Sequence, residues 1–160
     1  MPNKFTNTTV CELTASGFDN KFNVKAPQNG GLMLFYFDWC GYCEDMKPEY
    51  IKLSKNKTFK ICAINGAVKK NKPIFAKYKI PGAPFIKYFN KNGKLMAGDY
   101  KGNRTATDML KFIKSKSSNL SQTGGAKKKP RKKTKATKKR TRKTTTKKST
   151  GLLDMLTGLF

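Results

Sequence analysis

Short apolar runs alternate with polar segments along the first 117 residues of the chain. The runs at 32–37, 59–64 and 85–89 are too short to cross a bilayer, and their aromatic and β-branched content is typical of buried strands. Residues 8–13 alternate between apolar and polar side chains, which predicts one further strand.

Helix-spaced apolar residues separate these runs. A helix is predicted at 43–55, with Pro48 bending it because proline lacks a backbone donor. A second helix is predicted at 73–78, where proline suits the first turn, and a third from Thr105 onward. Strands and helices in this alternation predict an α/β fold with one mixed sheet covered by helices.

Turn-forming residues lie between these predicted strands and helices. Residues 16–19 predict a turn into a short helical segment, and 26–31 break the chain before the central strand. Asn-Gly at 92–93 lies between the run at 85–89 and residues 94–100, a pattern that predicts an antiparallel hairpin.

Composition changes sharply after this region. The sequence predicts a domain at 1–117, a linker at 118–125, a disordered tail at 126–150 and a short apolar segment at 151–160. The tail has 14 Lys or Arg residues and no acid, so it cannot bury enough apolar surface to offset the entropy of ordering. The first 125 residues are basic too, with 21 basic and 8 acidic residues in a chain of net charge +26.

Cys40 and Cys43 carry the strongest chemical signal. Cys40 falls where the predicted strand turns into a helix, and there unpaired N–H groups and the helix dipole favour a thiolate. Cys43 lies about one helical turn deeper on the same face, close enough to form a disulfide and more shielded. We interpret the pair as one attacking and one resolving thiol.

Two structural roles for Cys40 and Cys43, a zinc site and a static disulfide, fit the sequence less well. A zinc site needs about four ligands, whereas the other cysteines, Cys11 and Cys62, are isolated and the chain has no histidine. A static disulfide closing so small a loop would constrain the unfolded chain little. Cys11 and Cys62 are predicted to be packed side chains, and a bond between them is left open.

Trp-Cys-Gly-Tyr-Cys at 39–43, after an aromatic strand, resembles the active site of the thioredoxin and protein disulfide isomerase family. Pro48, five residues after the second cysteine, is similar to the family's helix proline. Ile-Pro-Gly-Ala-Pro at 80–84 resembles its cis-proline loop, Asn-Gly at 92–93 resembles the hairpin turn that follows, and Gly102 matches a glycine after the last strand. The resemblance covers about residues 7–117.

The resemblance implies a thioredoxin-like fold in which Cys40 and Cys43 are catalytic and Pro84 follows a cis peptide bond facing them. It implies no cofactor or metal beyond the redox-active Cys40–Cys43 disulfide. Trp39 either shields the site or simply packs. The supporting residues of the predicted site are Trp39, Gly41, Tyr42, Ala83 and Pro84.

Two departures from the family pattern concern charge. Leu34 stands where the family usually has a buried acid that accepts a proton from the second cysteine, so slow or pH-shifted resolution is expected. Asp38, Glu44 and Asp45 lie near the site and oppose thiolate formation. We therefore expect a comparatively stable disulfide, as in a reductant or isomerase.

The basic tail is predicted to bind nucleic acid through phosphates, without base readout, because it has no aromatic residue. Alternatively, the basic tail is a nuclear-localisation signal, or its charges only keep it solvated. Residues 151–160 could dock on an anionic membrane or a protein. The basic residues assigned to nucleic-acid binding are Lys127, Lys128, Lys129, Arg131, Lys132, Lys133, Lys135, Lys138, Lys139, Arg140, Arg142, Lys143, Lys147 and Lys148.

The sequence thus predicts a thiol–disulfide oxidoreductase acting on protein disulfides or dithiols and localised to nucleic acid. The alternative is a non-enzymatic nucleic-acid-binding structural or virion protein whose thioredoxin-like domain is only a scaffold. The first 18 residues contain no apolar core of a secretory signal, so a cytoplasmic, nuclear or virion location is expected.

Overall fold

A four-stranded mixed sheet forms the centre of the protein. The structure is a computed structural model and describes residues 5–25 and 29–122 of the 160-residue chain. The strands are β1 (Cys11–Leu13), β2 (Gly31–Tyr36), β3 (Lys60–Asn65) and β4 (Phe85–Phe89), in the order β1-β3-β2-β4. β3 runs parallel to β1 and β2, and β4 is antiparallel to β2.

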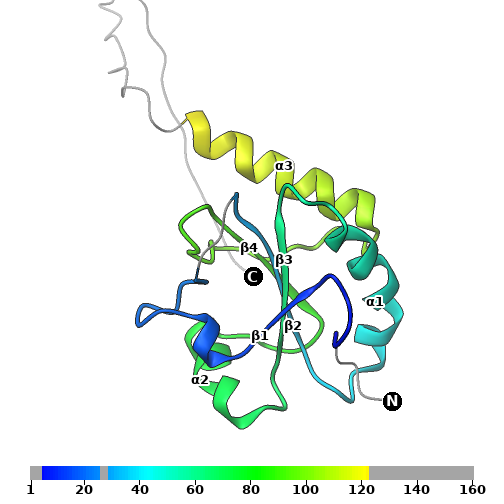
Figure 1. Cartoon of the computed structure of the whole chain (residues 1–160), viewed down its shortest axis with the longest axis vertical. Coiled ribbons are helices and arrows are strands. Elements are labelled where there is room, and N and C mark those ends of the chain that lie inside the picture. The colour runs from blue at the N-terminus through cyan, green and yellow to red at the C-terminus, as the bar shows by residue number, and fades with distance from the viewer. Residues whose placement is uncertain (1–4, 26–28, 123–160) are drawn as a thin grey trace, which may run out of the picture. The chain divides into compact units, whose positions relative to one another are not determined.

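Helices cover both faces of this sheet (Figure 1). α1 (Gly41–Ser54) and α3 (Ala106–Gln122) lie on one face, and α2 (Lys72–Lys77) lies on the other. Two short 3-10 turns, η1 (Ala15–Gly17) and η2 (Lys69–Asn71), complete the described elements. The expected α/β architecture is confirmed.

All six residues of β2 are buried, because both faces of this strand are covered. Leu32, Leu34 and Tyr36 belong to the apolar cluster beneath α1 and α3. Met33 and Phe35 belong to the cluster on the α2 side, which also contains the buried Phe89 of β4. A strand buried on both faces shows a continuous apolar run, as this one does.

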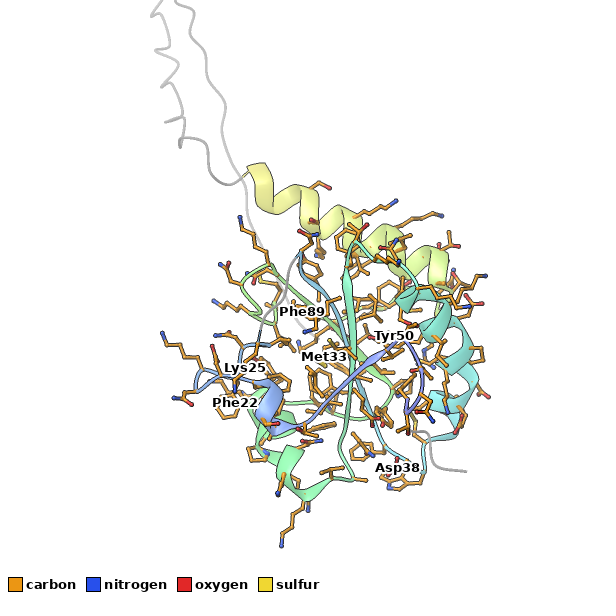
Figure 2. The ribbon with its side chains drawn as sticks, in the orientation of Figure 1. Phe22, Lys25, Met33, Asp38, Tyr50 and Phe89 are labelled. Atoms are coloured by element: carbon orange, nitrogen blue, oxygen red, sulfur yellow. A yellow bond between two sulfur atoms is a disulfide. The ribbon has the colours of Figure 1, made fainter. Side chains whose placement is uncertain are left out.

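Tyr50 ties α1 to the sheet. Its ring is completely buried, and its hydroxyl donates to the backbone oxygen of Cys62 at 2.8 Å, with the Leu32 oxygen at 3.3 Å. Figure 2 shows Tyr50 in the interior between α1 and the strands. A buried hydroxyl needs such partners, so this contact restricts how α1 can sit on the sheet.

The start of α3 is fixed by two side chains. The Asp108 N–H donates to the Thr105 hydroxyl oxygen at 3.2 Å, which confirms the predicted helix start. A carboxylate oxygen of Glu49, on α1, accepts from the Ala106 N–H at 2.7 Å. This bond places an acidic side chain at the positive end of α3 and joins the two helices.

Three predicted elements have different boundaries in the structure. Residues 94–100 form no strand after β4; an isolated bridge joins Phe89 to Leu95, and Gly98 has a φ of +84° that interrupts an extended path. β1 is shorter than predicted because the Thr8 hydroxyl bonds the backbone at Phe5 and Val10.

The third difference is at the end of α3, which continues to Gln122 across part of the predicted linker. Once a helix has formed, each further residue adds a hydrogen bond, so a polar sequence can extend it. The predicted tail at 126–150 and apolar segment at 151–160 lie outside the described residues. No helix in the described part is long and apolar enough to cross a membrane.

Gly31 lies in the sheet at a position with no room for a side chain. A Cβ atom there would lie 1.6 Å from the backbone oxygen of Lys60 on β3. We therefore expect Gly31→Ala to lower the free energy of unfolding by about 2 kcal/mol or more, measured by urea denaturation. Gly82→Ala is the matched control, because its Cβ would meet nothing within 4 Å; a similar loss in both variants would contradict the packing argument.

Candidate active site

Cys40 and Cys43 form a disulfide across the first turn of α1. Their Cα atoms are 5.2 Å apart, and the Cys43 N–H donates to the Cys40 oxygen at 3.0 Å. Cys40 is the N-cap residue with an extended backbone, and Cys43 is inside the helix. The sulfur atoms therefore lie at the helix end where unpaired N–H groups favour negative charge.

The two cysteines differ in exposure in the predicted direction. Cys40 is 7% exposed and Cys43 is 1% exposed, and both belong to the apolar cluster under α1 and α3. β2 ends at Tyr36, and a turn in which the Cys40 N–H donates to the Phe37 oxygen at 3.2 Å leads into the helix. Cys40 is thus the cysteine that a substrate can reach first.

The loop before β4 borders the apolar cluster to which both cysteines belong. The peptide bond between Ala83 and Pro84 is cis, as the family resemblance implies. Ala83 packs against the apolar cluster that contains both cysteines. The loop and the disulfide therefore border one apolar cluster, although they are distant in sequence.

Two aromatic side chains beside the disulfide face the solvent. Trp39 is 75% exposed and Tyr42 is 71% exposed. One face of Trp39 stacks on Phe37, with ring centroids 4.6 Å apart and an angle of 11° between the planes. Gly41, between them in sequence, has no atom within 4 Å of an added Cβ, so the surface here is open.

No acidic side chain replaces the usual buried acceptor at position 34. Leu34 is fully buried in the cluster that holds both cysteines. Glu44 forms a surface ion pair with Lys47 at 3.8 Å, which offsets part of its charge near the site. Asp38 lies in the loop just after β2 (Figure 2), and its Oδ1 atom is buried with no hydrogen-bond partner among the described residues.

A hydrogen bond that sequence analysis missed lies next to this loop. The Tyr36 hydroxyl donates to Glu12 Oε1 at 2.5 Å, and Phe5 packs edge-on against the Tyr36 ring at 5.3 Å. Burial, and then the Glu12 carboxylate, raise the pKa of Tyr36, so its hydroxyl remains protonated. The partners are 24 residues apart, and no local motif in the sequence indicates the contact.

Cys11 and Cys62 are free thiols on neighbouring strands. Cys62 is fully buried, as predicted, but Cys11 is only half-buried and lines a surface cavity. The interpretation of Cys11 as simply packed is therefore incomplete. Among the described residues, no group of three or more histidine, cysteine or acidic side chains could hold a metal ion.

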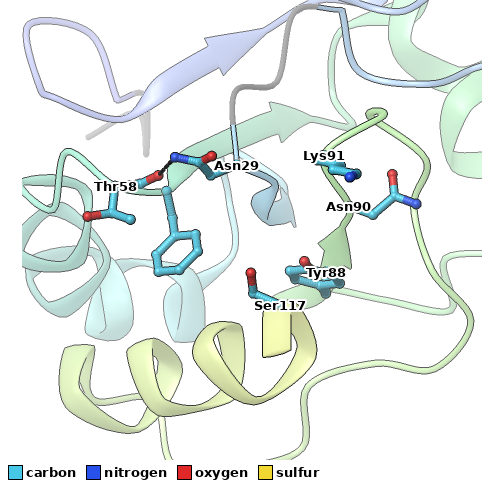
Figure 3. A pocket seen from close by; sticks show the side chains of 7 residues that line it. Asn29, Thr58, Tyr88, Asn90, Lys91 and Ser117 are labelled. Atoms are coloured by element: carbon cyan, nitrogen blue, oxygen red, sulfur yellow. Dashed lines mark hydrogen bonds between the residues drawn. The ribbon is translucent and has the colours of Figure 1, made fainter. Parts of the chain in front are cut away.

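A second cavity shares Thr58 and Phe59 with the Cys11 cavity and lies at the end of the sheet away from the disulfide. It has a volume of about 360 Å³, and Figure 3 shows Asn29, Tyr88, Asn90 and Ser117 around it. Asn29 precedes β2 and Asn90 follows β4, whereas Cys40 comes after β2. This polar cavity is therefore separate from the disulfide.

Comparison with known proteins agrees with this geometry. The family model Thioredoxin matches residues 9–115. Protein disulfide-isomerase from Triticum aestivum is 36% identical over 110 residues, covering 66% of this chain and 21% of that protein. Human protein disulfide-isomerase A6 is 33% identical over 107 residues, covering 63% of this chain and 23% of that protein.

A solved structure shows the same fold. The first thioredoxin domain of mouse protein disulfide-isomerase A4 superposes with a TM-score of 0.56 at 26% identity, covering 80% of this chain and 85% of that one. Fold and disulfide together define a thioredoxin-like domain with a Cys-x-x-Cys disulfide. The chain belongs to the thioredoxin family, whose members use the redox-active disulfide itself and need no external cofactor. It spans about a quarter or less of the curated relatives described here.

The difference in exposure predicts an order of modification. After reduction, a neutral alkylating reagent should modify Cys40 on the order of tenfold faster than Cys43, because Cys40 is more accessible and lies at the helix end. The experiment uses Cys11→Ser, since the half-buried Cys11 would compete. Peptide mass spectrometry measures the two rates, and faster modification of Cys43 would contradict the assignment.

Proposed function

We propose that this chain catalyses thiol–disulfide exchange on protein substrates, with Cys40 as nucleophile and Cys43 as resolving thiol. The observation that carries the proposal is the disulfide at the N-terminus of α1, whose first cysteine is the more exposed. The Cys40 thiolate attacks a substrate disulfide, forming a mixed disulfide and releasing one substrate thiolate. Cys43 then attacks Cys40, which restores the Cys40–Cys43 disulfide and releases the second substrate thiol.

The surface around the disulfide supports an extended protein substrate. The backbone beside Ala83 and Pro84 offers polar groups for strand-like pairing, and Trp39 and Tyr42 offer exposed rings on the other side. Because the chain contains no histidine, the Cys40 thiolate depends on helix N–H groups and surrounding positive charge. These features favour binding of an unfolded or flexible segment.

The buried Leu34 limits the resolving step. Cys43 must lose a proton before it attacks, and the apolar side chain beneath it cannot accept one. Acids near the site also disfavour an unusually acidic Cys40, which supports a role as reductant or isomerase. The mixed disulfide should therefore persist longer than in a relative with a carboxylate at this position.

Reduction of insulin by dithiothreitol tests the catalytic assignment. Cys40→Ser should reduce turnover to the uncatalysed rate, because it removes the attacking sulfur. Cys43→Ser should accumulate mixed disulfides through Cys40, since no resolving thiol remains. Equal activity of wild type and Cys40→Ser would instead favour the hypothesis that the domain is a non-enzymatic scaffold.

We further propose that the basic tail holds the domain on nucleic acid. The proposal is supported by sequence alone, because residues 126–150 lie outside the described part of the structure. Fourteen cationic residues without an aromatic one can neutralise phosphates but cannot read bases. Packaged nucleic acid in a virus particle, the nucleus or the cytoplasm would provide the phosphates. Residues 151–160 would be a separate docking segment for a membrane or a protein.

The tail proposal predicts strong salt dependence. If six phosphates are neutralised, affinity for duplex DNA should fall by on the order of a thousandfold between about 50 and 200 mM salt. Fluorescence anisotropy with unrelated duplexes of equal length measures both salt dependence and sequence preference. Deleting 126–160 should abolish binding while insulin reduction persists, and deleting only 151–160 should leave DNA binding unchanged. Salt-insensitive or sequence-selective binding would overturn the proposal.

A further inference from the structure

Cys11 and Cys62 face each other across two neighbouring strands. β1 and β3 pair in parallel with Cys11 opposite Cys62, and both side chains contribute to the apolar cluster on the α2 side. Adjacent strands are about 4.8 Å apart, which lies within the range of Cα separations that a disulfide spans, about 4.4–6.8 Å. β1 has three residues, lies at the edge of the sheet and pairs with β3 alone among the described strands.

Cys11 and Cys62 differ in exposure, as expected of an accessible attacking thiol and a shielded resolving thiol. Cys62 is fully buried, whereas Cys11 is half-buried and lines a cavity of about 400 Å³. Lys57 and Lys60 line the same cavity, together with hydroxyl and amide side chains such as Thr9 and Asn56. A cavity of this size holds a small molecule, and its charge favours an anionic one.

The groups around Cys11 also favour its thiolate. A hydrogen bond from the Cys62 thiol, and more weakly the charge of Lys60, lower the pKa of Cys11 to about 6, against the opposing effect of burial. The same hydrogen bond, together with burial, raises the pKa of Cys62. Tyr50, on the other face of the sheet, donates its hydroxyl to the Cys62 backbone oxygen; burial raises its pKa, so it carries no charge. The proton therefore remains on Cys62.

We propose that Cys11 and Cys62 form a second thiol–disulfide exchange site, which takes small anionic disulfides in the cavity lined by Lys57 and Lys60. The Cys11 thiolate attacks one sulfur of the small disulfide, forming a mixed disulfide and releasing one small thiolate. Cys62 then loses its proton and attacks the Cys11 sulfur. A Cys11–Cys62 disulfide forms and the second small thiol leaves, so two protein thiols are oxidised and one disulfide is reduced.

The first step activates the second. While Cys11 is a thiolate, its hydrogen bond and negative charge hold the proton on Cys62. Formation of the mixed disulfide removes that charge, so the barrier to deprotonating Cys62 falls when its attack is needed. The site is independent of the Cys40–Cys43 disulfide and of the function proposed for it.

Full-length Cys40→Ser/Cys43→Ser protein isolates this site for a test with oxidised glutathione as the anionic probe. At neutral pH, peptide mass spectrometry should find a Cys11–Cys62 disulfide, and Cys62→Ala in the same background should instead retain glutathione on Cys11. If Cys62→Ala does not fold, the crosslink in the parent protein still decides the question. No reaction at Cys11, or a stable glutathione adduct beside an unreacted Cys62 in the parent protein, would overturn the proposal.

Charge selection is tested with cystamine, a cationic disulfide of similar chemistry. In the Cys40→Ser/Cys43→Ser background, Lys57→Gln/Lys60→Gln should slow the reaction with oxidised glutathione at least about threefold more than the reaction with cystamine, because the loss of Lys60 weakens the Cys11 thiolate toward both probes. Lys69→Gln/Lys70→Gln removes the same charge beyond the other end of β3 and should change neither rate. Equal slowing by both lysine pairs would contradict a cavity selective for anions and leave only a general effect of net charge.

Discussion

Burial of β2 on both faces is the constraint on which the active site depends. Because every residue of this strand is buried, its register and direction are fixed by packing against α1, α3 and α2. The chain leaves the strand at Tyr36 and reaches Cys40 within one turn, so a rigid strand end determines where the disulfide lies. Tyr50 fixes the helix that follows by donating to the sheet backbone. The reactive sulfurs are thus held between two well-packed elements.

Electrostatics at this site depend on the N-terminus of α1 and on nearby surface acids, because no buried proton acceptor stands at position 34. Leu34 provides no proton acceptor, and no histidine is present in the sequence. The N-terminus of α1, together with the surrounding positive charge, stabilises a thiolate at Cys40, and the helix end acts much less on Cys43, inside the helix. The site is therefore better suited to the attacking step than to the resolving step. This asymmetry follows from one apolar substitution beneath the disulfide.

The elements that determine the fold could be predicted because their signals are local. The apolar run of β2, the Cys-x-x-Cys spacing and the Thr105–Asp108 helix start each lie within a few residues. The second arm of the hairpin turns back antiparallel to β4 as predicted, but it is not a regular strand, since a strand pattern does not reveal that Gly98 takes a positive φ. The hydrogen bond between Tyr36 and Glu12, and the half-exposure of Cys11, depend on which strands become neighbours. Such contacts arise only when the sheet is assembled.

The two cysteine pairs show how the same side chain acquires different chemistry from its position in one fold. In the first pair, a helix end stabilises the exposed sulfur and the helix itself holds the second sulfur one turn away. In the second pair, two parallel strands hold the sulfurs, and the buried thiol stabilises the thiolate of its neighbour by donating a hydrogen bond to it. The dipole of the helix stabilises the Cys40 thiolate and does not change during the reaction. The Cys11 thiolate depends instead on a hydrogen bond that is lost once Cys11 reacts. The second pair therefore changes its own reactivity during the reaction, while the first keeps its electrostatic support throughout.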